Sequence, residues 1–82
     1  MTGGAEARRL MDQATALAHQ GRMDDAALLY EQALARDAGL AEAHYNLGIA
    51  RRRRGRVAEA EACWRRALEL KPDFAPARIN LG

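Results

Sequence analysis

The sequence predicts an all-α fold, a solenoid of helix-turn-helix repeats, from an internal repeat and from composition. The chain matches itself at a shift of 34 residues, so that residues 41–48 (AEAHYNLG) fall on residues 75–82 (APARINLG) with five of eight positions identical. Hydrophobic residues make up 49% of the chain and are mostly alanine, with one Trp, one Phe and two Tyr. This composition suits close-packed helices better than an aromatic-rich sheet.

The same shift divides the whole chain into units. It pairs Gly21 with Gly55 and Tyr30 with Trp64, and it lays residues 7–40 on residues 41–74. At 82 residues the chain is long enough for one domain. We therefore expect a single solenoid domain with this organisation: a leader at 1–6, repeat 1 at 7–40, repeat 2 at 41–74, and the start of a truncated repeat 3 at 75–82.

Within each unit the apolar residues recur at intervals of three and four, the spacing of one helix face. Gly21 and Gly55 stand where the first helix of each pair should end, because glycine adopts the left-handed conformation of that position at little cost. Pro72 closes the second unit, since proline cannot continue a helix. These signals predict helices near 6–20, 24–37, 41–54, 58–71 and from 75 onward.

The pattern resembles the tetratricopeptide repeat (TPR) family, whose 34-residue unit reads W-x2-L-G-x2-Y, then A-x3-F, A and P. Repeat 2 matches best, through Leu47, Gly48, Ala60, Trp64, Ala67 and Pro72. His44 and Arg51 stand where the pattern prefers Trp and Tyr. Repeat 1 departs further, with Gln13 for Leu and Ala38 for Pro, so it is expected to be an atypical, capping repeat.

The resemblance implies a concave groove lined by the first helix of each repeat, and a module that binds an extended peptide or a partner helix there. Mapped residue by residue, it implies these partner-binding positions: Arg8, Met11, Asp12, Thr15, Ala18, His19, Glu42, Tyr45, Asn46, Ile49, Arg52, Arg53, Pro76, Ile79 and Asn80. It implies no catalytic site. The alternative is that the chain is a structural, oligomerising or positioning region of a larger protein, which could itself be an enzyme. In that case the exposed C-terminal repeat edge would be the surface for self-association.

Asn46 and Asn80 recur at the same repeat position, and an amide can both donate to and accept from a peptide backbone. The Asn-Leu-Gly stretches are similar to the repeats of the O-linked N-acetylglucosamine transferase, where such asparagines line the groove. Asp12 interrupts this ladder in repeat 1. The competing interpretation is that the amides only bond to neighbouring turns. The carboxylate clamp of some family members is not reproduced, because Met11, Thr15 and Pro76 occupy its positions.

A run of arginines covers residues 51–54, followed by Arg56. Successive helix residues turn by about 100°, so the run should splay around the helix and end it as a solvated, basic last turn. Arg52 and Arg53 nevertheless fall on groove positions, and repeat 2 carries eight basic against five acidic residues. We therefore expect these two arginines to select an acidic segment of a protein partner, and nucleic-acid binding to be weak and non-specific.

The sequence offers little for other chemistry. Cys63 is the single cysteine, so neither an intrachain disulfide nor a cysteine zinc cluster can form, and no metal or cofactor is expected. Trp64, Cys63 and His44 are interpreted as packing residues. No glycine-rich phosphate loop or nucleophile motif is present. Without an apolar stretch that could act as a signal or a membrane span, we expect a cytoplasmic protein.

Overall fold

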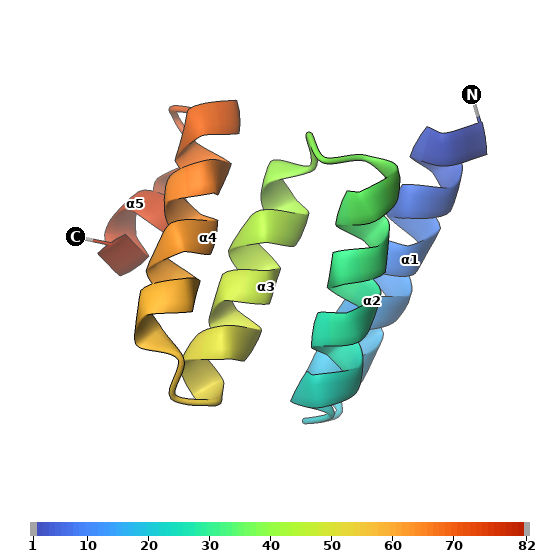
Figure 1. Ribbon diagram of the computed structural model, residues 1–82, viewed down its shortest axis with the longest axis horizontal. Helices are drawn as coiled ribbons and strands as arrows, with labels where there is room; N and C mark the ends of the chain where they lie inside the picture. The colour runs from blue at the N-terminus through green and yellow to red at the C-terminus, as the bar shows by residue number, and fades with distance from the viewer. Residues whose placement is uncertain (1, 82) are drawn as a thin grey trace.

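The computed structural model describes residues 2–81, which contain five α-helices and no strand (Figure 1). The helices are α1 (Thr2–His19), α2 (Met23–Arg36), α3 (Ala41–Arg53), α4 (Val57–Leu70) and α5 (Ala75–Leu81). The all-α class and the helix-turn-helix solenoid predicted from the sequence are confirmed. Most helix ends lie within two residues of their predicted positions.

The start of α1 differs from the prediction. The helix begins at Thr2 instead of near residue 6, so the expected leader is largely helical. The two glycines at positions 3 and 4 lie in this first turn, and each lowers helix stability by about 1 kcal/mol relative to alanine. That cost disfavours a helix but does not forbid one.

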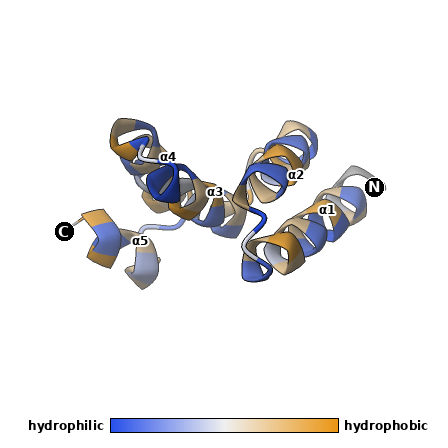
Figure 2. Ribbon diagram, turned by 90° about the horizontal axis from the view of Figure 1, so that it is seen from below, coloured by the Kyte–Doolittle hydropathy of each residue, from blue (hydrophilic) through white to orange (hydrophobic). Residues whose placement is uncertain are grey.

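The helices form two antiparallel hairpins, α1 with α2 and α3 with α4, and α5 packs on α4 (Figure 1). In the view turned by 90°, α2 and α4 lie along one side of the molecule and α1 and α5 along the other, with α3 between them (Figure 2). Helix α1 also contacts α3 directly. The first helices of the three units therefore face the same side, as the repeat pattern requires.

The turn inside each hairpin follows one design. Gly21 has φ of 83° and Gly55 has φ of 82°, the left-handed conformation expected of them. The residue after each glycine donates its backbone N–H to a carbonyl in the last turn of the helix, Arg22 to Leu17 and Arg56 to Arg51, both at 2.9 Å. This pattern satisfies carbonyls that a helix end leaves without partners.

Alanine dominates the core. Most of its buried positions are alanines at 0–1% exposure: Ala7, Ala14, Ala26, Ala33, Ala43, Ala50, Ala60, Ala67 and Ala77. Each complete hairpin adds one large aromatic side chain, Tyr30 at 1% exposure and Trp64 at 2%. Small residues let the helices approach closely, and the aromatic ring fills the space that remains between them.

Gly48 and Trp64 form the tightest of these contacts. A Cβ atom added to Gly48 would lie 2.4 Å from Nε1 of Trp64 and 2.8 Å from its Cδ1, so the indole occupies the space of the missing side chain. The indole Nε1 donates a hydrogen bond to the carbonyl oxygen of Tyr45 at 3.1 Å. In repeat 1 the equivalent positions hold a larger residue and a smaller ring, Ala14 and Tyr30, both in the same core cluster.

Candidate functional site

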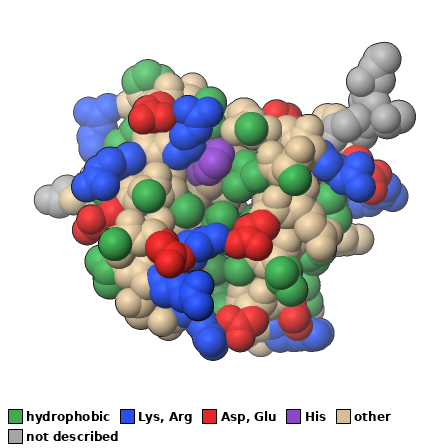
Figure 3. Space-filling model, viewed as in Figure 1, with side chains coloured by type: hydrophobic (Ala, Val, Ile, Leu, Met, Phe, Trp, Pro, Cys, Tyr) green, Lys and Arg blue, Asp and Glu red, His purple; other side chains and the backbone are tan. Residues whose placement is uncertain are grey.

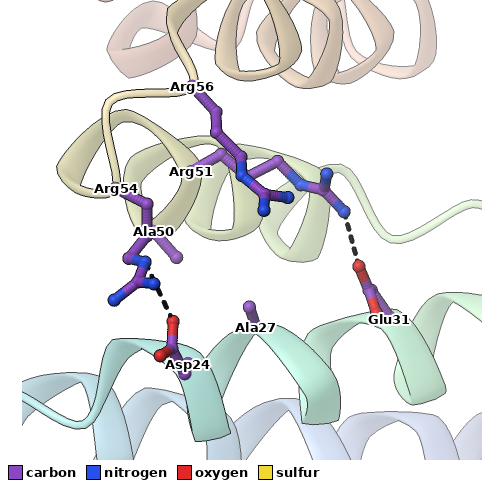
Figure 4. Close-up of a pocket in the computed structure, with 7 residues that line it drawn as sticks. All are labelled: Asp24, Ala27, Glu31, Ala50, Arg51, Arg54 and Arg56. Carbon is purple, nitrogen blue, oxygen red and sulfur yellow. Dashed lines mark hydrogen bonds and ion pairs between the residues drawn. The ribbon is translucent and has the colours of Figure 1, made fainter.

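The arginine run at the end of α3 divides between two faces of the molecule. The guanidinium of Arg51 pairs with Glu31 of α2 at 2.5 Å and with Glu59 of α4, and Arg54 pairs with Asp24 of α2 at 3.1 Å (Figure 4). These contacts lie on the face formed by α2, α3 and α4, where acidic and basic side chains alternate (Figure 3). The positive charge on this face is therefore largely offset.

Arg51 corrects the expectation of a simple solvated helix end. Its side chain is only 22% exposed, and it joins Glu31 of repeat 1 to Glu59 of repeat 2. Its Nε atom is buried without a hydrogen-bond partner in the described part of the chain. Arg51 therefore serves the junction between repeats. Glu59 belongs to the same repeat as Arg51, but Glu31 is brought in by the tertiary fold from 20 residues away.

Arg52 and Arg53 line hollows on a different part of the surface, although Arg53 also borders a hollow with Arg54, Asp24 and Asp25. Both are exposed, and within residues 2–81 neither forms an ion pair. They line two adjoining hollows that we call the first and second pockets. The first pocket, about 210 Å³ between α1, α2 and α3, is lined by Thr15, Ala18, His19, Met23, Tyr30, Asn46, Ile49 and Arg53. The second, about 450 Å³ between α3 and α5, is lined by Tyr45, Ile49, Arg52, Arg53 and Asn80.

The first pocket has a fixed polar floor. The hydroxyl of Thr15 donates to the carbonyl oxygen of Met11 at 3.0 Å and lies 2.8 Å from the hydroxyl of Tyr30. Burial raises the pKa of Tyr30, although hydrogen bonds with Thr15 and Asn46 partly oppose that shift. The phenol therefore stays neutral and retains its proton across the physiological range.

The second pocket repeats this arrangement with different helices. The amide Nδ2 of Asn80 in α5 lies 3.5 Å from the hydroxyl of Tyr45 in α3. The Tyr45 ring packs edge-on against Phe74, with the ring centroids 5.4 Å apart and an interplanar angle of 88°. Each pocket thus combines a tyrosine hydroxyl, an asparagine amide and at least one arginine.

Most positions implied by the repeat pattern line these pockets, with two kinds of exception. Met11 is 5% exposed and belongs to the core cluster of repeat 1, so it is wrong as a surface contact. Its thioether packs inward because α1 covers α2 over that turn. Five further positions are exposed but line neither pocket: Arg8, Asp12, Glu42, Pro76 and Ile79.

Two lining residues of the first pocket were not assigned to the groove from the sequence. Met23 and Tyr30 come from α2, the second helix of repeat 1, whereas the repeat pattern draws groove positions from first helices. Tyr30 was interpreted as a spacer, and its ring is indeed buried in the core. Thr15 could have indicated that Tyr30 also reaches the pocket, because its hydroxyl stands at a groove position on the facing helix.

His44 and Cys63 lie outside both pockets. Nε2 of His44 lies 3.1 Å from the carbonyl oxygen of Ala38, and burial lowers the pKa of the imidazole, with the Arg66 charge adding to the effect. Cys63 is half-buried, and burial raises the pKa of its thiol. A protonated thiol is a poor nucleophile, so Cys63 behaves as a packing residue.

His44 provides a test of stability against pH. Because its folded-state pKa lies below the ordinary value of 6.5, the unfolded chain binds more protons, and stability should fall as pH drops from about 6.5 through the folded pKa. We expect His44→Gln to reduce this loss between about pH 7.5 and pH 5, measured by urea unfolding. The variant leaves every other residue unchanged, so the difference between the two proteins reports on His44. Identical pH dependence of the two proteins would contradict the assignment.

The fold and the repeated pockets define the class of the molecule, a helical-repeat protein with a lined groove. Two tetratricopeptide repeat models match the chain, at residues 6–42 and 41–74, and the chain belongs to that family. No curated protein matches it. Tetratricopeptide repeats generally mediate protein–protein interactions and are typically non-catalytic scaffolds. Over the described residues, no helix has the length and hydropathy needed to cross a membrane.

Proposed function

We propose that this chain is an interaction module that holds an extended, acidic segment of a partner protein in the groove formed by α1, α3 and α5. The observation that carries the proposal is the placement of Arg52 and Arg53, two unpaired cations among the described residues, in adjoining pockets of that groove. Exposed cations next to a shaped surface raise the local concentration of oppositely charged segments and speed their association.

The balance of charge favours the groove over the opposite side of α3. The hollow around Arg51, Arg54 and Arg56 also contains Asp24 and Glu31, so its charges offset one another (Figure 4). By contrast, no Asp or Glu is among the described residues that line the first and second pockets. The division of the run between two faces also argues against one continuous phosphate-binding surface for nucleic acid.

The asparagines supply the contacts that would hold a peptide backbone. Asn46 and Asn80 each line one pocket, and each amide has hydrogen-bonding capacity beyond its contact with a tyrosine hydroxyl. The resemblance of the Asn-Leu-Gly stretches to the repeats of the O-linked N-acetylglucosamine transferase implies the same role for these two amides. It also gives the groove a way to bind many sequences, because backbone groups are common to all of them.

Charge reversal tests the proposal. Replacing both groove arginines, Arg52→Glu with Arg53→Glu, should slow association with a captured partner by about tenfold at low salt and flatten its salt dependence. The matched control is Arg65→Glu with Arg66→Glu, which makes the same change of net charge on α4, where both arginines already face acids. Surface plasmon resonance on proteins captured by the parent chain measures the rates.

Three outcomes would contradict this function. The groove variant could bind the captured partners as fast as the parent and the control. The parent could self-associate in sedimentation and retain no partner, which would favour the oligomerising role. Tight binding of a duplex or a single strand at physiological salt would replace the protein partner with nucleic acid.

A further inference from the structure

The two pockets repeat one set of side-chain groups. The first offers the Asn46 amide and the Arg53 guanidinium above the Tyr30 hydroxyl. The second offers the Asn80 amide and the Arg52 guanidinium beside the Tyr45 hydroxyl. The asparagines occupy the same repeat position in both pockets, but the two tyrosines occupy different repeat positions. Their convergence therefore comes from the fold and could not be obtained by sliding the sequence on itself.

The pocket chemistry selects a carboxylate. A guanidinium donates hydrogen bonds, an amide can donate through its NH2, and a carboxylate only accepts. Bonds from arginine to a carboxylate are charge-assisted and stronger than neutral ones. The apolar wall of the first pocket includes Met23, Ala18 and Ile49, against which the methylene groups of a glutamate side chain can pack.

The spacing of the pockets restricts the ligand further. They lie on either side of α3 and share Ile49 and Arg53 as lining residues. Packed helices stand about 8–10 Å apart, so the pocket centres are separated by about one such step. A chain in the extended polyproline II conformation advances about 3.1 Å per residue, so three residues cover that distance.

We infer that the bound segment carries two acidic side chains three residues apart, with one in each pocket. We assign them as glutamates because their methylene groups can pack on the apolar wall of the first pocket. This inference rests on the proposed function of the groove and adds the spacing rule by which it distinguishes one acidic segment from another. In the polyproline II form of an extended chain, which has three residues per turn, side chains three residues apart point to the same side. Adjacent side chains point in different directions, so only one of two adjacent carboxylates can reach the groove.

Synthetic peptides test the spacing directly. The probes are fluorescein-labelled, acetylated peptides of about twelve residues, made of Ser, Gly, Ala and Thr with two glutamates placed next to each other, three apart or six apart. All three have the same composition and charge. In fluorescence anisotropy at low salt, the peptide with glutamates three apart should bind at least about threefold more tightly than the others. Equal dissociation constants for the three peptides would overturn the inference.

A double-mutant cycle assigns each glutamate to a pocket. Asn46 lines only the first pocket and Arg52 only the second, so Asn46→Ala and Arg52→Gln report on them separately. Each glutamate of the best peptide is replaced by glutamine in turn. We expect Asn46→Ala to lose sensitivity to one replacement and Arg52→Gln to the other. If both variants lose sensitivity to the same glutamate, the two-pocket arrangement is wrong.

The failure of this inference can be told apart from the failure of the proposed function. If all acidic peptides bind alike and Arg52→Glu with Arg53→Glu abolishes that binding, the spacing rule is wrong but the basic groove remains. If no peptide binds, the inference is overturned. If, in addition, the Arg52→Glu with Arg53→Glu variant captures the same protein partners as the parent chain, the groove is excluded as the binding site. Circular dichroism of every variant confirms that the helices are retained.

Discussion

Trp64→Ala is expected to lower the free energy of unfolding by about 3–5 kcal/mol, the usual cost of removing a large buried aromatic side chain. The indole is 2% exposed and lies in a core whose other fully buried members are alanines: Ala60, Ala67 and Ala77. Alanine side chains cannot move to fill the cavity, because they have no rotatable bonds. The hydrogen bond from the indole to the Tyr45 carbonyl is lost as well.

Urea unfolding followed by circular dichroism measures this loss, because the only tryptophan is removed by the change. Trp64→Phe is the graded control and should lose less, since it keeps most of the ring volume. Replacement of an exposed α4 residue, Arg65→Ala, should change stability by no more than a few tenths of a kcal/mol. A Trp64→Ala protein within about 1 kcal/mol of the parent would show that the indole is not a core residue.

Gly48→Ala should destabilise the protein by about 1–3 kcal/mol, although alanine is the better helix former. The added methyl would lie 2.4 Å from Nε1 of Trp64, well inside contact distance, so the indole or α3 must shift. The gain in helix propensity of about 1 kcal/mol offsets only part of this cost. Thermal and urea unfolding of the single variant measure the net effect.

Repeat 1 shows how the clash can be relieved. There the equivalent pair is Ala14 and Tyr30, and both are fully buried. Alanine is larger than the glycine of repeat 2, and the tyrosine ring is smaller than the indole. The double variant Gly48→Ala with Trp64→Tyr copies that pair into repeat 2. We expect it to be more stable than the sum of the two single changes predicts, which a double-mutant cycle detects. Additive effects would show that the size of the residue at position 48 does not restrict which ring fits at position 64.

The sequence predicted the fold well because a repeated unit supplies the same information more than once. Glycines at 21 and 55 each marked a hairpin turn, and both adopt the left-handed conformation. Only the first helix was misplaced, at its start, because residues 1–6 lie outside the part of the chain that the 34-residue shift lays on itself.

The groove was predicted less completely. Arg52 and Arg53 were distinguished from their neighbours because the family's repeat pattern places them at groove positions, and both line pockets in the structure. The Glu31 partner of Arg51 was missed because the junction between repeats brings together residues from separate hairpins. Met11 was assigned to the groove by its repeat position alone. A repeat position does not show whether a side chain is buried against the core of repeat 1, as Met11 is.

The division of one arginine run between two faces has a consequence for how such a protein can vary. Arg51 and Arg54 bind acids of neighbouring helices, whereas Arg52 and Arg53 face the groove. A substitution at the first pair alters how the repeats are joined, whereas under the proposed function one at the second pair alters which segments the groove attracts. The contacts that join the repeats and the proposed binding preference of the groove are therefore encoded by adjacent codons. Each can change by substitution without a change in the other.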